Sequence, residues 1–458
     1  MKTKNICIVS NWSGFNYGAH LTHYALYRFL SDRGYSVRML EKPDYEPFPP
    51  LCTPDLFKIN PYGENALFPI FNSLSAMEET NNVCDTFIVG SDQLWNNELF
   101  GHSMEFYLLS FVESRCKKIS YSTSLGAVPL ELGDCQKGLM NVLLNRFDGV
   151  SVRESDGKEY LKDQFDINAT LVLDPVFLNE AVVYKDLFKE DTFSPEIEAE
   201  SYVFCYFIHP SRQKMEFANE IAKRKQKRIV FIGDALENSL NNNDINLDKN
   251  IKVEEWLSYI YYSDSVIADS FHALCFSLIF QKQVYSVFDS KKHANRIISL
   301  RKLLGIPEGI FFENSSVKEG LENIEKHKID YGVVKNRLEE EIENSRSWLL
   351  HCLESEKNTN SDNLDEILVA YNVLYSREKE KEKKLHFLEE KYRSIDREAD
   401  LEVYKKTIVE LNHECEEERK KLLVSQKEIE SIKLSLSFRI GSALLFVPKK
   451  IYALFHSK

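Results

Sequence analysis

Short runs of β-branched and aromatic residues alternate with amphipathic stretches along the first 350 or so residues of the chain. The first run, 5–10, is followed by a loop containing Gly and Asn and by a helix predicted from about Gly18 to Arg33, which Gly34 ends. This alternation is typical of parallel sheets whose strands are joined by crossover helices. Further strands are predicted at 36–40, 85–89, 118–123, 149–152 and 170–173.

A polar, acidic stretch from about 188 to 201 interrupts this pattern, which then resumes. The later strands are predicted at 202–208, 228–233, 265–268 and 283–288. The pattern therefore predicts two Rossmann-like α/β domains, 1–188 and 189–358. Ligands bind such folds at the carboxyl ends of the strands, so the cleft between the domains is the expected site. The Pro-rich segment 45–61 lacks periodicity and is predicted to be a long loop over that cleft.

After about residue 360 the chain has no Gly or Pro until Gly441, and Lys and Glu dominate. Apolar positions recur there at alternating spacings of 3 and 4, at Leu401, Tyr404, Ile408, Leu411 and Cys415. This heptad pattern predicts a coiled coil over 362–435, and hence a homo-oligomer. A single solvated helix is the alternative interpretation.

The last segment, 436–458, is short, apolar and flanked by Lys and Arg, as in Phe446-Val447-Pro448-Lys449-Lys450. Such an amphipathic tail fits the membrane interface, where anionic lipids attract basic residues. Docking onto another subunit is the alternative, and we slightly favour the membrane surface.

Composition narrows the class of protein. The 458 residues carry a formal net charge of -13 and show no basic face of the kind that binds nucleic acid. Nine cysteines include no C-x-x-C pair, which indicates reduced thiols and no zinc site. The N-terminus leads into a strand rather than a signal-peptide core, and no apolar run approaches the roughly 20 residues that span a bilayer. We therefore expect a cytoplasmic protein, with any contact to the inner face of the plasma membrane being peripheral.

The loop around Asn16, Tyr17 and Gly18 lies between the first strand and its helix. Gly18 lets a backbone approach a ligand, and the helix N-terminus offers amides to an anion. No dinucleotide or P-loop glycine pattern is present, so an ordinary strand-to-helix turn is the alternative.

A second polar cluster, Ser91, Asp92, Gln93 and Asn96, follows the strand at 85–89 and surrounds Trp95. Ser91 and Asp92 are candidate substrate ligands, with a helix cap as the simpler role. Trp95 is a candidate for stacking on a sugar ring, and burial in the core is the alternative.

Two further strand ends carry residues suited to an anionic reaction. Arg153 ends the strand at 149–152, where a guanidinium suits a carboxylate or phosphate; a surface pair with Glu154 is the alternative. Ser270 is predicted to cap the helix after 265–268, with His272 in its first turn. A histidine there can transfer protons near neutral pH, although a lone histidine is more often structural.

Together these segments resemble the polysaccharide pyruvyl transferase family, in family order and over roughly residues 5–305. The matching motifs are Asn16-Tyr17-Gly18-Ala19, Val89-Gly90-Ser91-Asp92-Gln93-Leu94-Trp95-Asn96, Tyr121-Ser122-Thr123-Ser124-Leu125-Gly126, Ser151-Val152-Arg153-Glu154, Leu173-Asp174-Pro175-Val176-Phe177-Leu178 and Asp269-Ser270-Phe271-His272.

The resemblance implies a fold similar to two-domain GT-B glycosyltransferases and transfer of pyruvate from phosphoenolpyruvate onto sugar hydroxyls as a ketal, in surface-glycan or exopolysaccharide biosynthesis. It implies no cofactor and no metal, and an acceptor that is a sugar or a lipid-linked glycan. By position, His272 is the expected catalytic histidine and Arg153 the expected anion-binding arginine. Some family members have arginine where this chain has Ser270, and Arg296 is the expected substitute for that charge. A nucleotide-sugar glycosyltransferase and a non-catalytic scaffold of a glycan-assembly complex remain the alternatives.

Overall fold

The computed structural model describes residues 4–11, 16–40, 57–58, 60–63, 65–100, 103–188, 199–233, 239–248, 250–307, 309–326 and 328–357, with the single residues 413, 417 and 420. The chain divides into two compact units: one holds 1–130 and 147–357, and the other holds 131–146, with α5 (Asp134–Leu144), and 358–458. The predicted coiled coil (362–435) and tail (436–458) lie outside the described residues, three positions aside. None of the helices described is long and apolar enough to cross a membrane.

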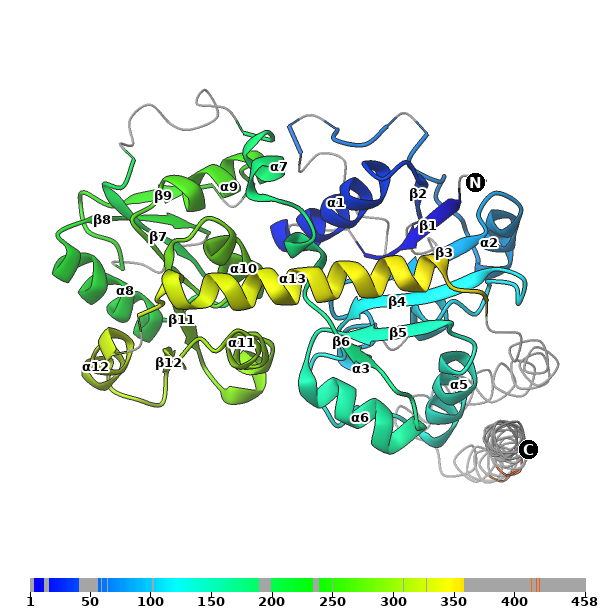
Figure 1. Cartoon of the computed structure of the whole chain (residues 1–458). Coiled ribbons are helices and arrows are strands. Elements are labelled where there is room, and N and C mark those ends of the chain that lie inside the picture. The colour runs from blue at the N-terminus through cyan, green and yellow to red at the C-terminus, as the bar shows by residue number, and fades with distance from the viewer. Residues whose placement is uncertain are drawn as a thin grey trace, which may run out of the picture. The chain divides into compact units, whose positions relative to one another are not determined.

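The first unit contains two sheets, each of six parallel strands (Figure 1). The strands of the first sheet run in the order β2-β1-β3-β4-β5-β6. Their bounds are β1 (Asn5–Val9), β2 (Ser36–Leu40), β3 (Thr86–Val89), β4 (Lys117–Thr123), β5 (Gly149–Val152) and β6 (Thr170–Leu171). The helices of this half are α1 (Tyr17–Ser31), α2 (Leu74–Met77), η2 (Glu78–Asn82), α3 (Asn97–Phe100), α4 (Met104–Tyr107), α6 (Ser155–Phe165), η4 (Pro175–Phe177) and α7 (Ala181–Lys185).

The second sheet has the order β12-β11-β10-β7-β8-β9. Its strands are β7 (Tyr202–Tyr206), β8 (Arg228–Ile232), β9 (Ile245–Leu247), β10 (Ser265–Ala268), β11 (Gln283–Phe288) and β12 (Ile310–Phe312). Its helices are α8 (Arg212–Lys225), α9 (Val253–Tyr262), α10 (Phe271–Ile279), α11 (Lys291–Leu304), α12 (Val317–Lys326) and α13 (Tyr331–Glu354). The prediction of two parallel α/β halves is confirmed, while β9 and β12, short strands at the two sheet edges, were not predicted.

Both sheets reverse their winding direction at one point, between β1 and β3 in the first and between β10 and β7 in the second, and this positions the candidate site. In the first sheet β1 lies between β2 and β3, and in the second β7 lies between β10 and β8. Loops diverge to opposite faces at such a switch point and leave a crevice at the carboxyl ends of the strands. The segments after β1, β3 and β10 carry Asn16, Asp92 and His272 respectively, so the polar motifs of the sequence lie at these switch points.

Helix α1 is buried on nearly every side because it serves two cores. Leu26, Phe29 and Leu30 pack in the core of the first sheet. Tyr17 and Leu21 pack in a core that includes α9, α10 and strands of the second sheet. Tyr17 stacks on Trp256 of α9 with ring centroids 5.5 Å apart. The two halves thus share a continuous apolar core through α1.

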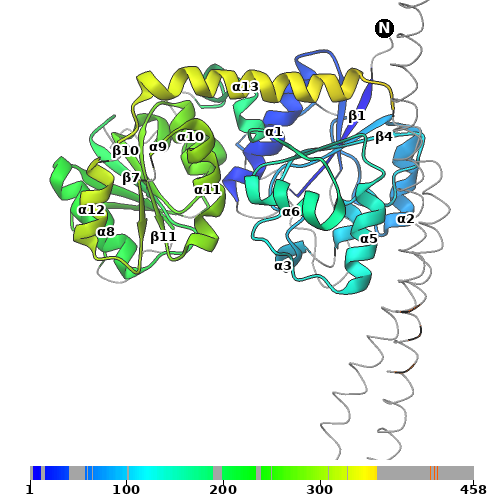
Figure 2. The same cartoon turned by 60° about the horizontal axis from the view of Figure 1, so that its bottom comes forward.

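Helix α13 joins the halves a second time, and Figures 1 and 2 show it lying along both. Its first turn buries Val334 in the core of the second half, whereas Leu349 and Leu353 near its end pack in the core of the first sheet. Of the segment predicted to be a loop over the cleft, most lies outside the described residues; Phe57 contacts Tyr24 of α1, and the Lys58 amide donates to Glu254 of α9 at 2.9 Å.

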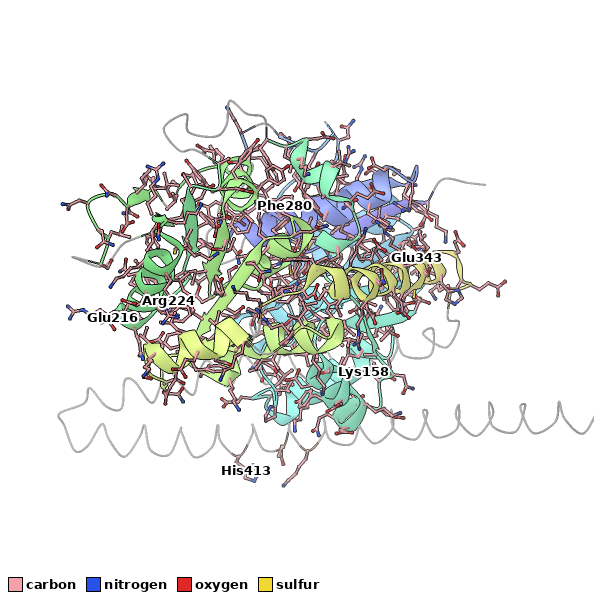
Figure 3. All side chains as sticks on the ribbon, turned by 60° about the vertical axis from the view of Figure 1, so that its left-hand side comes forward. Lys158, Glu216, Arg224, Phe280, Glu343 and His413 are labelled. Carbon is pink, nitrogen blue, oxygen red and sulfur yellow. The ribbon has the colours of Figure 1, made fainter. Side chains whose placement is uncertain are left out.

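A buried lysine caps the end of α13. Lys117 Nζ donates to the Cys352 carbonyl at 2.7 Å and to the Ser355 carbonyl. It thus supplies a hydrogen-bond donor at the end of the helix, where backbone carbonyls have no partner within the helix. Burial lowers the pKa of Lys117. We expect Lys117→Met to lower the free energy of unfolding by about 1–3 kcal/mol, because buried carbonyls lose a charged donor. Thermal melting measures this, with the exposed Lys158 of α6 (Figure 3) changed to Met as the matched control. Equal melting temperatures for both variants would contradict the role of Lys117.

Candidate active site

The centre of the site is the carboxylate of Asp174, which has no exposed surface. Asp174 precedes η4, where its Oδ1 accepts from the Val176 amide at 3.0 Å and Pro175 occupies the first position of the turn. Strand β6 ends at Leu171 instead of at the predicted position 173, because its partner β5 ends at Val152. Asp174 Oδ2 accepts from Arg153 Nη2 at 2.7 Å. Burial would raise the pKa of Asp174, but Arg153 and His272 hold it well below its usual range.

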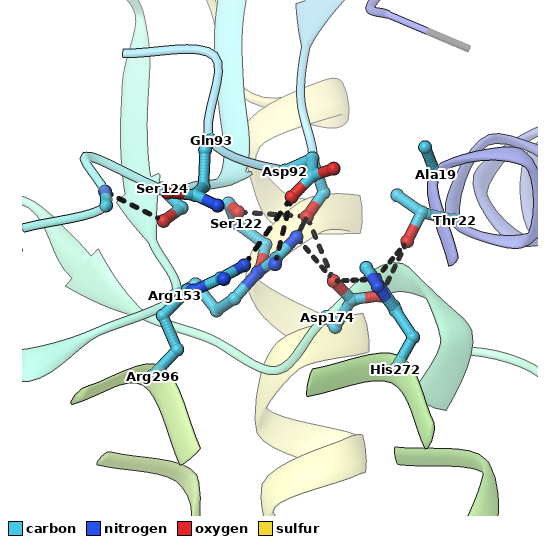
Figure 4. Close-up of polar contacts among 12 residues, drawn as sticks. Ala19, Thr22, Asp92, Gln93, Ser122, Ser124, Arg153, Asp174, His272 and Arg296 are labelled. Atoms are coloured by element: carbon cyan, nitrogen blue, oxygen red, sulfur yellow. Dashed lines mark hydrogen bonds and ion pairs between the residues drawn. The ribbon is translucent and has the colours of Figure 1, made fainter. Parts of the chain in front are cut away.

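His272 approaches this carboxylate from the other half of the protein. Ser270 caps α10 by accepting from the Ala273 amide at 3.4 Å, and this sets His272 in the first turn. The ring places Nε2 at 2.9 Å from Thr22 Oγ1 and 3.5 Å from Asp174 Oδ2. Figure 4 shows His272 and Thr22 together on one side of Asp174, with Arg153 on the other.

The ring of His272 lies directly on Gly18. A Cβ at position 18 would come within 2.0 Å of His272 Nδ1, so any larger residue would displace the ring. Thr22 follows Gly18 by one helical turn, and the two residues form the surface of α1 on which the ring rests. In this structure the side chain of His272 makes the close approach that Gly18 allows, and approach of a ligand to Gly18 stays a prediction.

Two arginines converge on Asp92, whose backbone has the unusual φ of 89°. Arg153 Nη1 lies 3.5 Å and Arg296 Nη1 lies 3.8 Å from Asp92 Oδ1, and the pKa of Asp92 is lowered by these arginines and His272 against the opposing effect of burial. The Phe271 ring lies beneath both guanidinium groups, with centroid distances of 4.7 Å and 5.8 Å.

Exposure separates the two arginines. The side chain of Arg153 is 2% exposed and is bound by Asp174, Asp92 and the hydroxyl of Ser91. The side chains of Asp92 and Arg296 are 18% and 22% exposed. In this structure Arg296 is the more exposed of the two guanidinium groups, whereas Arg153 organises the buried carboxylates. That Arg153 itself binds the substrate stays a prediction.

Among the other predicted site residues, Ser91, Trp95 and Tyr17 are buried, whereas Asn16 is exposed. Ser91 is fully buried and donates to Asp174 Oδ2 at 3.1 Å. Asn16 caps α1 by accepting from the Ala19 amide at 3.3 Å. Trp95 has the alternative role stated for it, burial in the core, since it is 3% exposed and its N–H donates to the Tyr107 carbonyl. The ring of Tyr17 likewise fills the core shared by the two halves.

Sequence reasoning assigned no role to Asp174 or Thr22. An Asp-Pro pair directly after a predicted strand is the signal that marks Asp174 as a capping and site-facing acid. Thr22 gives no signal of its own, because its role depends on α10 meeting α1. Among the residues described, no group of three His, Cys, Asp or Glu side chains is placed to hold a metal ion.

Glu154, next to Arg153, is a buried acid beneath the site. Its Oε1 accepts from the Leu125 amide at 2.6 Å, and burial raises its pKa to about 7. The folded chain therefore binds a proton at Glu154 more tightly than the unfolded chain, in which a Glu titrates near about 4.3. The stability that this proton contributes is complete below about pH 4.3 and is lost as the pH rises through 7.

We expect Glu154→Gln to remove this dependence. As the pH is raised from 5 to 8 the parent chain loses the stability that this proton contributes and the variant does not. The free energy of unfolding of the variant should therefore rise relative to that of the parent, by on the order of 3 kcal/mol at most. Denaturant unfolding at both pH values measures the difference, and Glu159→Gln, at an exposed position of the same helix, is the control. A stability difference that is the same at pH 5 and pH 8 would contradict the raised pKa.

Several solved structures resemble the chain at low sequence identity. An α-glucosyltransferase solved with UDP and a 13-mer DNA is 11% identical, with 76% of this chain and 95% of that chain covered and a TM-score of 0.43. UDP-GlcNAc 2-epimerases from Neisseria meningitidis (11% identity, 81% and 100% covered, TM-score 0.47) and Methanocaldococcus jannaschii (10% identity, 70% and 92% covered, TM-score 0.48) are similar to the same degree. Scores this low add nothing to the two-sheet architecture itself.

No curated protein sequence matches the chain. The family model for polysaccharide pyruvyl transferase, in contrast, matches residues 16–291, which is more than half of the 458 residues. This range starts at the cap of α1 and includes Asp92, Arg153, Asp174 and His272. The chain belongs to the polysaccharide pyruvyl transferase family.

Proposed function

We propose that this site transfers pyruvate from phosphoenolpyruvate to a sugar, where it forms a ketal with two hydroxyl groups. The observation that carries the proposal is a cluster of buried carboxylates that a histidine and a partly exposed arginine join in a member of this family, His272 at Asp174 and Arg296 at Asp92. Arginine suits the carboxylate and phosphate of the donor, and histidine suits the proton transfers that the reaction requires.

The reaction balances with one donor and two hydroxyls. A proton adds to the methylene carbon of phosphoenolpyruvate and leaves positive charge on the adjacent carbon. The first sugar hydroxyl attacks that carbon and loses its proton, and the C–O bond to phosphate breaks. The second hydroxyl then closes the ketal and loses its own proton to the released phosphate, so that the products are the pyruvylated sugar and inorganic phosphate.

The charges of the site favour this sequence. Arg296 would neutralise the departing phosphate, and the N-terminus of α10 faces the same cluster. Asp92 would keep Arg296 directed toward the donor. Holding donor and acceptor together supplies much of the remaining rate. An acceptor in surface-glycan biosynthesis, free or lipid-linked, agrees with the family, and the reaction needs no cofactor.

Phosphate release from phosphoenolpyruvate, measured with a panel of sugar acceptors, tests the proposal. The expected result is release that depends on the acceptor, together with an acceptor product heavier by one pyruvyl group. No release with any acceptor, and no thermal stabilisation by phosphoenolpyruvate, would overturn it. Stabilisation by a nucleotide sugar would then favour glycosyl transfer, and stabilisation by neither ligand would favour a scaffold.

A further inference from the structure

The hydrogen bonds of Thr22 determine which nitrogen of His272 carries a proton. Thr22 Oγ1 lies 3.1 Å from Asp174 Oδ1 and 2.9 Å from His272 Nε2. A threonine hydroxyl has one proton, and an ionised carboxylate can only accept. Because Arg153 keeps Asp174 ionised, the hydroxyl donates to Asp174 and accepts from the ring. His272 therefore carries its proton on Nε2.

The opposite tautomer would oppose this geometry. With the proton on Nδ1, the lone pair of Nε2 would face Asp174 Oδ2 at 3.5 Å with no proton between them. Thr22 would also have to give up its bond to Asp174 in order to donate to the ring. Both changes leave a buried carboxylate with fewer donors, which is costly.

The charged and titratable groups near the His272 ring lie on several segments of the chain. Asp174 precedes η4 and lies closest, at 3.5 Å. Asp92 follows β3, Arg153 ends β5, and Arg296 lies on α11. From α1, His23 also faces Asp92 and Asp174, but burial lowers its pKa to about 4, so it is uncharged near neutral pH.

We infer that Asp174 and Thr22 are positioning residues that hold the Nε2–H of His272, so that Nδ1 is the nitrogen that exchanges protons with the reactants. This inference rests on the proposed pyruvyl transfer. Nδ1–H of the imidazolium gives its proton to the methylene carbon of phosphoenolpyruvate, which leaves neutral His272 with Nε2–H. Nδ1 then takes the proton that the first sugar hydroxyl loses, and the imidazolium is restored.

In this cycle one histidine serves as acid and then as base. Asp174 stabilises the imidazolium and keeps the ring from rotating away, while Thr22 fixes the edge of the ring that faces the carboxylate. Gly18 allows the His272 ring to lie against the first turn of α1, because a Cβ at position 18 would lie only 2.0 Å from Nδ1.

The first test needs no substrate. Nitrogen-15 NMR of histidine-labelled full-length protein, with His272→Asn used to assign the signal among the 11 histidines, reports the tautomer directly. A neutral ring with its proton on Nε2 is expected, and a proton on Nδ1 would overturn the inference even if pyruvyl transfer occurs. An Nε2–H tautomer without any transfer would instead remove the proposed function and leave the geometry intact.

Kinetics supply the second test. Asp174→Asn should lower kcat by about 10²–10⁴-fold and move the basic limb of the pH profile to lower pH, because the imidazolium that donates the first proton loses its carboxylate. Since this variant also deprives Arg153 of its partner, Thr22→Val provides a milder change that leaves Asp174 and Arg153 in place. We expect Thr22→Val to lower kcat by about tenfold with the same direction of pH shift, and Thr22→Ser to restore both. A pH profile of Thr22→Val identical to that of the parent enzyme would overturn the positioning role.

Discussion

Replacement of His272 by Asn is expected to lower acceptor-dependent phosphate release by about 10²–10⁴-fold, the usual contribution of a positioned acid or base. Asn has roughly the reach of the near half of the ring, but it cannot exchange a proton at neutral pH. The effect should lie in kcat more than in the KM for phosphoenolpyruvate, because proton transfer occurs in the transition state. Steady-state rates over a range of donor concentrations measure both constants.

His293→Asn is the matched control, since His293 is an exposed histidine on α11 whose partner is Asp289 at 2.8 Å. It should keep the parent rate. Thermal melting of His272→Asn is needed beside the kinetics, because the ring is buried against Gly18 and Thr22. A folded His272→Asn variant with near-parental turnover would remove His272 from the mechanism.

The strands and the two-sheet arrangement could be predicted because buried parallel strands are continuous apolar runs. Arg228–Ile232 and Thr86–Val89 have this pattern and lie as predicted. The edge strands Ile245–Leu247 and Ile310–Phe312 have only three residues each, too few for any period to be recognised. Three-residue strands form because a neighbouring strand offers unpaired backbone groups, and the local sequence does not encode that.

The positions of the site residues could be predicted more reliably than their contacts. His272, Arg153 and Asp92 were chosen because each follows a strand, and the structure brings all three into one cluster around Asp174 (Figure 4). Their partners follow from the packing of one half on the other. A residue such as Thr22, four positions along a helix from Gly18, receives its role only when α10 is laid against α1.

Aromatic residues at strand ends were the least predictable. Trp95 and Tyr17 occur beside polar motifs, as sugar-binding aromatics do, yet both rings are needed to fill space. Tyr17 closes the core between the halves, and Trp95 packs edge-on against Phe147 with centroids 6.0 Å apart. Large aromatic rings bury more apolar area than other side chains. Their burial in the core is therefore strongly favourable, unless a preformed pocket exposes them to a ligand.

Replacement of Arg296 by Gln should raise the KM for phosphoenolpyruvate by about 10–100-fold, because a charge-assisted hydrogen bond contributes roughly 1.5–3 kcal/mol. We assign Arg296 this role because its side chain is 22% exposed and its guanidinium contacts Asp92, the face of Phe271 and the side-chain oxygen of Gln93. Arg296→Lys should recover part of the loss, as it restores the charge but not the planar fork. Initial rates against donor concentration, at low and at high salt, measure the change.

Two further variants separate anion binding by Arg296 from general effects of lost charge. Lys302→Gln removes an exposed cation from the same helix and should leave KM unchanged. Arg153→Gln should differ from Arg296→Gln by lowering mainly the stability of the protein. It leaves the buried Asp174 without its cation, so we expect the free energy of unfolding to fall by about 3–5 kcal/mol. If Arg153→Gln instead melts like the parent protein and raises KM while Arg296→Gln does not, then the buried guanidinium is the one that binds the donor, and the cluster must open around Arg153 during turnover.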